Sequence, residues 1–161
     1  MIRSLYIYIL FLLILVFTSC GFKPIYQTSE NNLHDETYSV EFKEDPGYLI
    51  KSKILEVYNA PSSQSMYTIE LNTSTNSASL ITNTDGTVSK YRVEVIITFD
   101  VTRSNSGNKI YADISRGFAE YLVQTSEIET DEKRKQAIGI AADEALQMMS
   151  IKIQSNILQS Q

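Results

Sequence analysis

The feature that most constrains the fold of this chain is a long alternation of apolar and polar side chains between residues 90 and 101. The apolar set is Tyr91, Val93, Val95, Ile97, Phe99 and Val101, and the opposite set is Lys90, Arg92, Glu94, Thr98 and Asp100. A period of two is typical of a β-strand, whose successive side chains point to opposite faces of a sheet. One face of this strand therefore belongs to a core, and the other is wet or covered by a partner.

Three other segments have the character of strands. Residues 38–43 alternate in the same way, and residues 67–81 begin with alternation and continue as a Ser/Thr/Asn-rich stretch. The third segment covers residues 110–123. Residues 83–86 and 104–107 are rich in Asn, Asp, Ser and Gly, which favour tight turns, so they predict two hairpins.

In the last predicted strand, the apolar side chains switch from even-numbered to odd-numbered positions. Its apolar side chains take even positions in 110–114 and odd positions in 119–123. A one-residue bulge near Arg116–Gly117 would return both sets to the inner face, and glycine suits such a position. With this bulge, Arg92 would lie opposite Glu120 on the outer face.

Two segments have the spacing of amphipathic helices. In the first, Asp45 can act as the N-cap and Pro46 as the first helical residue, and the apolar spacing stops at residues 59–61. In the second, residues 126–129 can form a capping box, and the helix runs to about Leu158. Its inner stripe is Ile138, Ala141, Ala142, Ala145, Met149, Ile153 and Ile157.

The predicted order is therefore strand, helix, three strands joined by hairpins, and helix. Two one-sided helices and a one-sided sheet bury their apolar faces only against each other. The predicted fold class is α+β, a two-layer sandwich of two helices on a mainly antiparallel four-stranded sheet. Because the first helix connects two strands, we expect those strands to be parallel neighbours.

The N-terminus has the anatomy of an export signal. Arg3 precedes an apolar run, Leu5–Phe17, which is shorter than the roughly 20 residues of a membrane-spanning helix. Cys20 is the only cysteine, so it cannot form an internal disulfide. Its surroundings resemble the lipobox of bacterial lipoproteins, in which the cysteine is acylated; an uncleaved anchor is the alternative. The predicted organisation is a signal peptide at 1–19, a lipidated tether at 20–37 and a periplasmic domain at 38–161.

Charge and chemistry narrow the function further. Cleavage before Cys20 leaves 13 basic and 19 acidic residues, a formal net charge of −6, which disfavours binding to nucleic acid. The only histidine, His34, has no neighbouring metal ligand. Asp143 and Glu144 diverge by about 100° around a helix axis, so they do not easily share a site. Because no nucleophile, base and orienting group can be assembled, we expect no enzyme, no metal and no cofactor.

The residues that follow the cysteine give a more specific signal. The segment Cys20–Tyr26, CGFKPIY, resembles the opening of the LPS-assembly lipoprotein family, LptE, in its alphaproteobacterial form. The order of elements, the Asp85–Gly86 turn followed by Arg92, and the small-residue patch at 141–145 resemble the family more loosely. The resemblance implies an outer-membrane lipoprotein that plugs the LPS-transport β-barrel LptD, supports its assembly and helps deliver lipopolysaccharide to the cell surface. Gly21 fits outer-membrane sorting.

Lipopolysaccharide carries phosphates, and phosphates are recognised by cations. The candidate phosphate ligands are Lys90, Arg92, Arg103 and Arg116. The competing interpretation is that Arg92 pairs with Glu120 across the strands, a surface contact worth about 0–1 kcal/mol. Ile96 interrupts the polar outer face, and Leu80 does so too if the second strand extends that far.

An alternative function comes from a different class, a tethered solute-binding or transporter-auxiliary lipoprotein whose sheet face holds a small ligand. That function requires a deep apolar pocket with a few convergent polar groups. A solid two-layer core would count against it.

Overall fold

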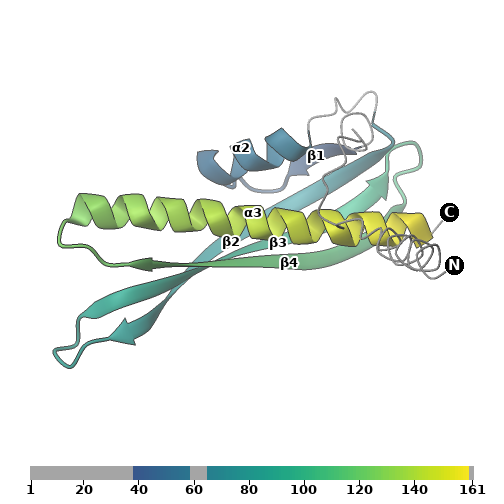
Figure 1. The fold of residues 1–161 in the computed structure, drawn as a ribbon. Coiled ribbons are helices and arrows are strands. Elements are labelled where there is room, and N and C mark those ends of the chain that lie inside the picture. Colours follow the sequence, from purple (N-terminus) through teal and green to yellow (C-terminus); the bar gives the residue numbers. More distant parts are fainter. Residues whose placement is uncertain (1–37, 59–64, 160–161) are drawn as a thin grey trace, which may run out of the picture. The chain divides into compact units, whose positions relative to one another are not determined.

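The computed structural model describes residues 38–58 and 65–159. Its elements are β1 (Tyr38–Phe42), α2 (Tyr48–Val57), β2 (Tyr67–Thr82), β3 (Val88–Arg103), β4 (Lys109–Leu122) and α3 (Glu127–Gln159). The four strands form one sheet in the order β1-β2-β3-β4, and both helices lie on the same face of it (Figure 1). The predicted α+β sandwich is confirmed. The predicted signal peptide, Cys20, the tether and Pro61 lie outside the described residues.

The sheet is mixed at one edge only. β1 runs parallel to β2, as the intervening helix predicts, whereas the β2–β3 and β3–β4 pairs are antiparallel. β1 is short and pairs with Tyr67–Leu71 alone, although β2 continues to Thr82. The second half of β2 therefore has β3 on one side and no strand on the other side among the described residues.

The core lies between the inner face of the sheet and the two helices. The alternation predicted for β3 is confirmed, because its side chains from Val93 to Val101 at odd positions are at most 1% exposed. The helix side is supplied by Ile50, Ile54, Ala141, Ala142, Ala145, Met149, Ile153 and Ile157, all buried. Burial of one large apolar side chain contributes roughly 1.5–3 kcal/mol, so this shared layer is the main source of stability.

The bulge predicted near Arg116–Gly117 is wrong. β4 stays in register with β3 through both residues, and its inner face is a continuous series of odd positions that includes Ser115 and Gly117. Ile110 and Ile114 consequently face outward and are 38% and 42% exposed. Arg92 does lie opposite Glu120, but without a bulge.

Gly117 has a different role, because it admits the backbone of α3. A Cβ at this position would lie 1.9 Å from the carbonyl oxygen of Ala141 and 2.6 Å from the amide nitrogen of Ala145. Glycine within a strand often marks such a close approach of another backbone. The small residues of α3 therefore serve helix–sheet packing, with the helix resting directly on β4.

The helix starts also differ from the expected caps. α2 begins at Tyr48 after Gly47, which has a φ of 77° and accepts the amide hydrogen of Lys51 at 3.0 Å. The side chain of Asp45 instead accepts the amide hydrogen of Gly47 at 3.3 Å, so Asp45 is not the N-cap. Positive φ suits glycine, which explains why the helix starts there rather than at Pro46.

At the start of α3, the capping contact is made by a residue inside the helix. The Thr130 hydroxyl accepts the amide hydrogen of Gln124 at 2.9 Å and lies 2.9 Å from the carbonyl of Ser126. Among the described residues, no side-chain bond joins Ser126 and Glu129, so the predicted capping box is not formed. α3 has 33 residues, about 50 Å of helix. None of the described helices is long and apolar enough to cross a membrane.

Candidate functional site

The outer face of the sheet, opposite the helices, is lined with cations that pair with carboxylates. Glu120 accepts a bond from Arg92 at 2.8 Å and a second one from Lys90. The Arg116 guanidinium lies 2.6 Å from the Glu94 carboxylate. These side chains come from β3 and β4, where the antiparallel register places Arg92 opposite Glu120. The predicted pairing of Arg92 with Glu120 is therefore present, although the bulge from which it was inferred is not.

A second group of charges lies nearer the other end of the same face. The Asp100 carboxylate pairs with the ammonium of Lys109 at 2.7 Å and with that of Lys43 at 3.1 Å. The Lys43 ammonium also lies 3.1 Å from the Glu70 carboxylate. Together, the two groups contain five cations and four carboxylates. Glu41 of β1, the register partner of Glu70, adds a fifth carboxylate to this face, so cations and carboxylates balance across it.

The pairing keeps the carboxylates ionised. Bonds from Lys90 and then Arg92 lower the pKa of Glu120 below its usual value. Bonds from Lys109 and then Lys43 lower the pKa of Asp100, against the opposing effect of burial. Both carboxylates therefore remain negative at neutral pH, and an incoming phosphate would have to share or displace them.

The structure gathers three of the four predicted phosphate ligands. Lys90, Arg92 and Arg116 lie in the network with Glu94 and Glu120, whereas Arg103 is at the opposite end of β3. Arg103 is eleven residues from Arg92, which corresponds to about 36 Å of strand. Within the described part of the chain, Arg103 has no carboxylate partner. Arg103 is therefore not part of a common cluster with the other three cations.

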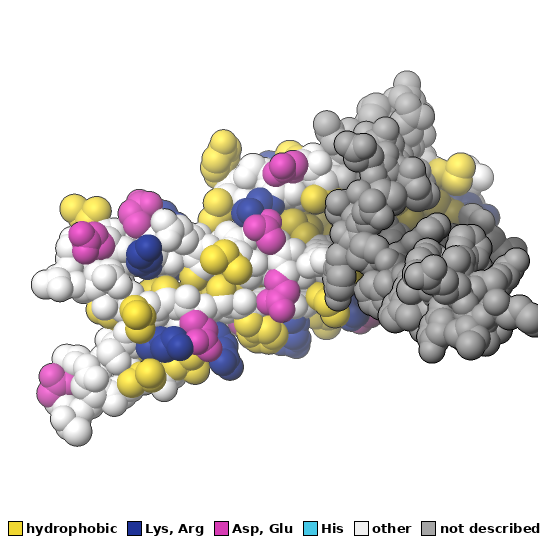
Figure 2. All heavy atoms as spheres, in the orientation of Figure 1, with side chains coloured by type: hydrophobic (Ala, Val, Ile, Leu, Met, Phe, Trp, Pro, Cys, Tyr) yellow, Lys and Arg dark blue, Asp and Glu magenta, His cyan; other side chains and the backbone are white. Residues whose placement is uncertain are grey.

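Apolar side chains are interleaved with these charges. Ile114, Phe118 and Leu122 on β4 are 42%, 45% and 56% exposed, and Ile96 on β3 is half-buried opposite Arg116. β2 does reach Leu80, which is 40% exposed. In Figure 2, hydrophobic side chains lie beside charged ones over the described surface.

We call Lys90, Arg92, Ile96, Ile114, Arg116 and Phe118 the outer patch. Its β4 apolar members were missed in the sequence because the assumed bulge assigned Ile114 to the core. Ile114 and Phe118 both occupy even-numbered positions of the strand, and this shared parity is the signal that could have identified them. The outer patch combines cations with exposed apolar side chains, as a site for an amphiphilic anion requires.

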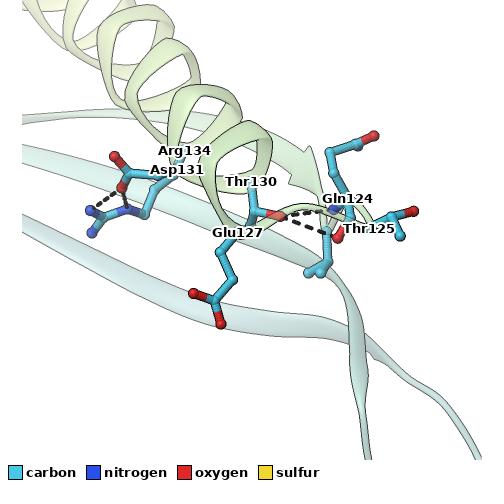
Figure 3. Close-up of a pocket in the computed structure, with 7 residues that line it drawn as sticks. Gln124, Thr125, Glu127, Thr130, Asp131 and Arg134 are labelled. Carbon is cyan, nitrogen blue, oxygen red and sulfur yellow. Dashed lines mark hydrogen bonds and ion pairs between the residues drawn. The ribbon is translucent and has the colours of Figure 1, made fainter.

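One surface hollow of about 290 Å³ lies at the start of α3. It is lined by the loop after β4 and the first turns of the helix, with Gln124, Thr130, Asp131 and Arg134 around it (Figure 3). Thr130 is already bonded to Gln124, and Arg134 lies 2.6 Å from Asp131. Thr130 and Arg134 thus already have partners within this hollow.

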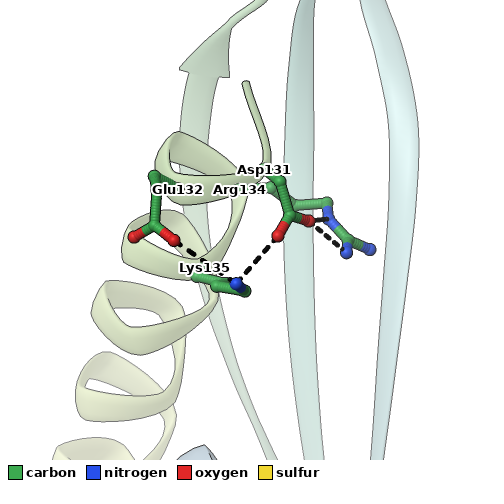
Figure 4. Close-up of polar contacts among 4 residues, drawn as sticks. All are labelled: Asp131, Glu132, Arg134 and Lys135. Carbon is green, nitrogen blue, oxygen red and sulfur yellow. Dashed lines mark hydrogen bonds and ion pairs between the residues drawn. The ribbon is translucent and has the colours of Figure 1, made fainter. Parts of the chain in front are cut away.

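A second hollow of about 410 Å³ lies between the start of α2, the inner face of β2 and α3. It is lined by Pro46, Gly47, Tyr48, Leu49, Ile50, Thr75, Ser77, Arg134, Lys135 and Ile138. Lys135 pairs with Asp131 at 2.8 Å and with Glu132 at 3.4 Å, so its charge is compensated within its own helix (Figure 4). Both hollows open to solvent, and neither is the deep apolar pocket that a solute-binding function requires.

Comparison with known proteins identifies the fold. No family model matches the chain, and no curated protein matches it in sequence. A protein from Caulobacter crescentus described as a candidate lipoprotein matches with a TM-score of 0.62 at 13% identity, covering 77% of this chain and 92% of its own. A minor lipoprotein from Acinetobacter baumannii matches with a TM-score of 0.54 at 16% identity, covering 75% of this chain and 92% of its own. The rare lipoprotein B of Shewanella oneidensis matches with a TM-score of 0.51 at 17% identity, covering 74% of this chain and 97% of its own. The chain therefore shares a fold found in several lipoproteins.

Proposed function

We propose that the chain is an outer-membrane lipoprotein, acylated at Cys20, that plugs the LPS-transport β-barrel LptD, helps assemble it and assists lipopolysaccharide delivery to the cell surface. The shared fold with lipoproteins and the lipobox-like segment around Cys20 support the anchor. The resemblance of Cys20–Tyr26 to the LptE family supports the choice of barrel.

The outer patch is the observation that carries this proposal. Lipopolysaccharide presents phosphates beside acyl chains, so a surface that binds it needs cations next to apolar groups. Arg92 and Arg116 still have guanidinium hydrogens beyond those shared with Glu120 and Glu94, because each guanidinium has five. Ile114 and Phe118 lie on the same face and are exposed enough to contact an acyl chain.

The plug role draws on the rest of the surface. A barrel lumen is lined by polar groups, and a domain that sits inside needs a polar exterior around a rigid core. The described domain has a buried apolar layer between its sheet and its helices, and its outer face carries ion pairs beside the exposed apolar side chains of the outer patch.

The barrel partnership is tested by mild detergent extraction of the full-length chain from cells. Co-purification with a large β-barrel is the expected result, together with loss of surface lipopolysaccharide when the protein is depleted. A chain that elutes alone, with normal surface lipopolysaccharide and a correctly assembled barrel after depletion, would refute the proposal.

The outer patch is tested separately with charge reversals. The variant Arg92→Glu should weaken binding of purified lipopolysaccharide, because it replaces an available cation by an acid. Arg103→Glu is the matched control, since it reverses the same kind of charge on the same sheet but away from the patch. Equal loss of binding in both variants would show that net charge, rather than the outer patch, governs the interaction.

A further inference from the structure

The second half of β2 is an unusual sheet edge. From Thr73 to Ser79 the strand pairs with β3 on one side, and within the described residues no main-chain partner lies on its other side. Apart from the half-buried Thr73, the side chains of this stretch are exposed. We call residues 73–79 the open edge.

The direction of its main-chain groups follows from the neighbouring pairs. The carbonyl of Leu71 accepts the amide hydrogen of Lys43, so odd residues of β2 direct their main-chain groups toward the β1 side. Because successive residues of a strand alternate in direction, Thr75, Ser77 and Ser79 present to the open edge amides and carbonyls that have no main-chain partner in the described part of the chain. A register shift between Ser79 and Ile81 ends this regular stretch.

The open edge lacks the features that normally block strand addition. Residues 72–82, NTSTNSASLIT, contain no charged residue and no proline. Native proteins commonly protect an edge with lysine, proline, a bulge or a covering element. Among the described residues this edge has just the terminal shift, so its seven residues keep an uncharged ladder available.

The hollow of about 410 Å³ borders the inner side of the open edge. Thr75 and Ser77 line it from β2, and α3 contributes Arg134 and Lys135. The apolar part of the lining includes Pro46, Tyr48 and Leu49. Tyr48 is 89% exposed and Leu49 37%, so apolar surface remains there to be covered. An added strand would direct alternate side chains over this hollow, since neighbouring strands share the alternation of faces.

β1 shows which kind of strand this side of β2 accepts. Its inward residues Tyr38, Val40 and Phe42 are aromatic or β-branched, and it pairs with β2 just before the open edge begins. A second copy of this chain fits less well, because its own open edge carries only small hydroxyl side chains on the inner side at residues 75, 77 and 79. Such side chains would leave Tyr48 and Leu49 uncovered.

We propose that the open edge of β2 binds an extended segment of a different polypeptide by strand addition, with apolar side chains at alternate positions over the adjacent hollow. Main-chain hydrogen bonds would supply affinity, and the hollow would supply selectivity, as in other cases of strand addition. The inference is independent of the proposed barrel and lipid.

The probe is a synthetic peptide of alternating valine and threonine, added at millimolar concentration to the full-length chain in detergent. Amide hydrogen exchange, followed by NMR, should slow about tenfold at Thr75, Ser77 and Ser79. The amides of Ser74, Asn76 and Ala78 already face β3, so their exchange should not change. In the same peptide with every amide N-methylated, the methyl groups block close strand pairing and no amide can donate to the carbonyls of β2, so this peptide should give no protection.

Two variants separate the edge from the fold. Ser77→Pro removes one outward donor and should abolish the protection, whereas Ser77→Ala keeps the donor and should retain it. Leu49→Asp should weaken it by altering the hollow. Unchanged exchange at all three outward amides would overturn the proposal. Protection that appears without peptide and grows with protein concentration would also overturn it, because a second copy would then occupy the edge.

Discussion

The two edges of the sheet differ in how far their main-chain groups are covered. At the β4 edge, the Glu144 carboxylate of α3 accepts the amide hydrogen of Phe118 at 2.6 Å, and the Lys152 ammonium donates to the carbonyl of Ile114 at 2.7 Å. At the β2 edge, nothing described beyond Leu71 covers the main chain. The difference comes from length, because α3 has 33 residues and extends along β4, whereas β1 has only five and stops early.

One edge of this sheet is covered and charged, whereas the β2 edge is uncovered and uncharged over the described residues. Charged side chains, among them Asp113, Arg116 and Glu120, are distributed along β4, whereas residues 72–82 of β2 have none. An uncovered edge normally risks uncontrolled association. Its retention on one side only is consistent with a binding role there, and the difference between the edges can be tested by altering each in turn.

The largest change in the free energy of unfolding is expected from blocking the close contact between α3 and Gly117 of β4. Gly117→Val places side-chain atoms where the α3 backbone now lies, and we expect it to destabilise the domain by at least about 3 kcal/mol. Urea unfolding measures this loss. Gly139→Ala is the matched control, because its Cβ would meet only the Lys53 side chain at 3.5 Å. That change should stabilise the domain by about 0.5–1 kcal/mol. Equal effects would show that α3 does not rest on Gly117.

A proline pair distinguishes the two sides of β2. Asn76→Pro removes an amide that faces β3 and should cost about 1–3 kcal/mol, because a ladder bond is lost and a carbonyl is left without its donor. Ser77→Pro removes an amide that faces the open edge and should cost clearly less. Chemical denaturation of both variants provides the comparison. A greater loss for Ser77→Pro would reverse the assigned directions.

A smaller effect is expected from uncovering β4. Glu144→Ala leaves the Phe118 amide without its carboxylate partner and should destabilise the domain by about 1 kcal/mol. The exchange of that amide should quicken, and light scattering should show more self-association. Gln147→Ala, on an exposed position of the same helix, is the control. No change in exchange at Phe118 would mean that Glu144 does not protect this edge.

The smallest effect concerns acid stability at the β4 edge. Lys152 first, then Tyr111 and the Ile114 amide, lower the pKa of Asp113 from 3.8 to about 2. A lowered folded-state pKa means that this carboxylate stabilises the fold above about pH 4, and that the contribution is lost as pH falls toward 2. Asp113→Asn should therefore reduce stability at neutral pH and flatten the acid limb of the unfolding profile. An unchanged acid limb would contradict the assigned role.

Local patterns predicted much of the fold. The period of two in β3, the turns at residues 83–86 and 104–107, and the inner stripe of α3 depend on neighbouring residues, so the sequence displays them directly. The pairing of Arg92 with Glu120 was expected by way of a bulge at Gly117, and it forms in a regular register without that bulge. The helix starts were less accurate, because Asp45 and Pro46 suit a cap as well as Gly47 does and only the actual backbone path distinguishes them.

The candidate site was only partly predictable. The sequence named Lys90, Arg92 and Arg116, but it grouped Arg103 with them because strand length was not yet translated into distance. It also assigned Ile114 to the core. That error came from treating Gly117 as a bulge, although the contact that requires glycine there is made by Ala141, far away in the chain.

The sequence by itself determined that this chain forms an α+β sandwich with one apolar layer, because hydrophobic periodicity is a local property that each element carries alone. Only the tertiary structure decided which edge of the sheet is covered and which side chains share the outer patch. Those outcomes depend on where α3 ends, how far β1 reaches and how closely two backbones approach. Such contacts join residues that are distant in sequence, so no local pattern specifies them.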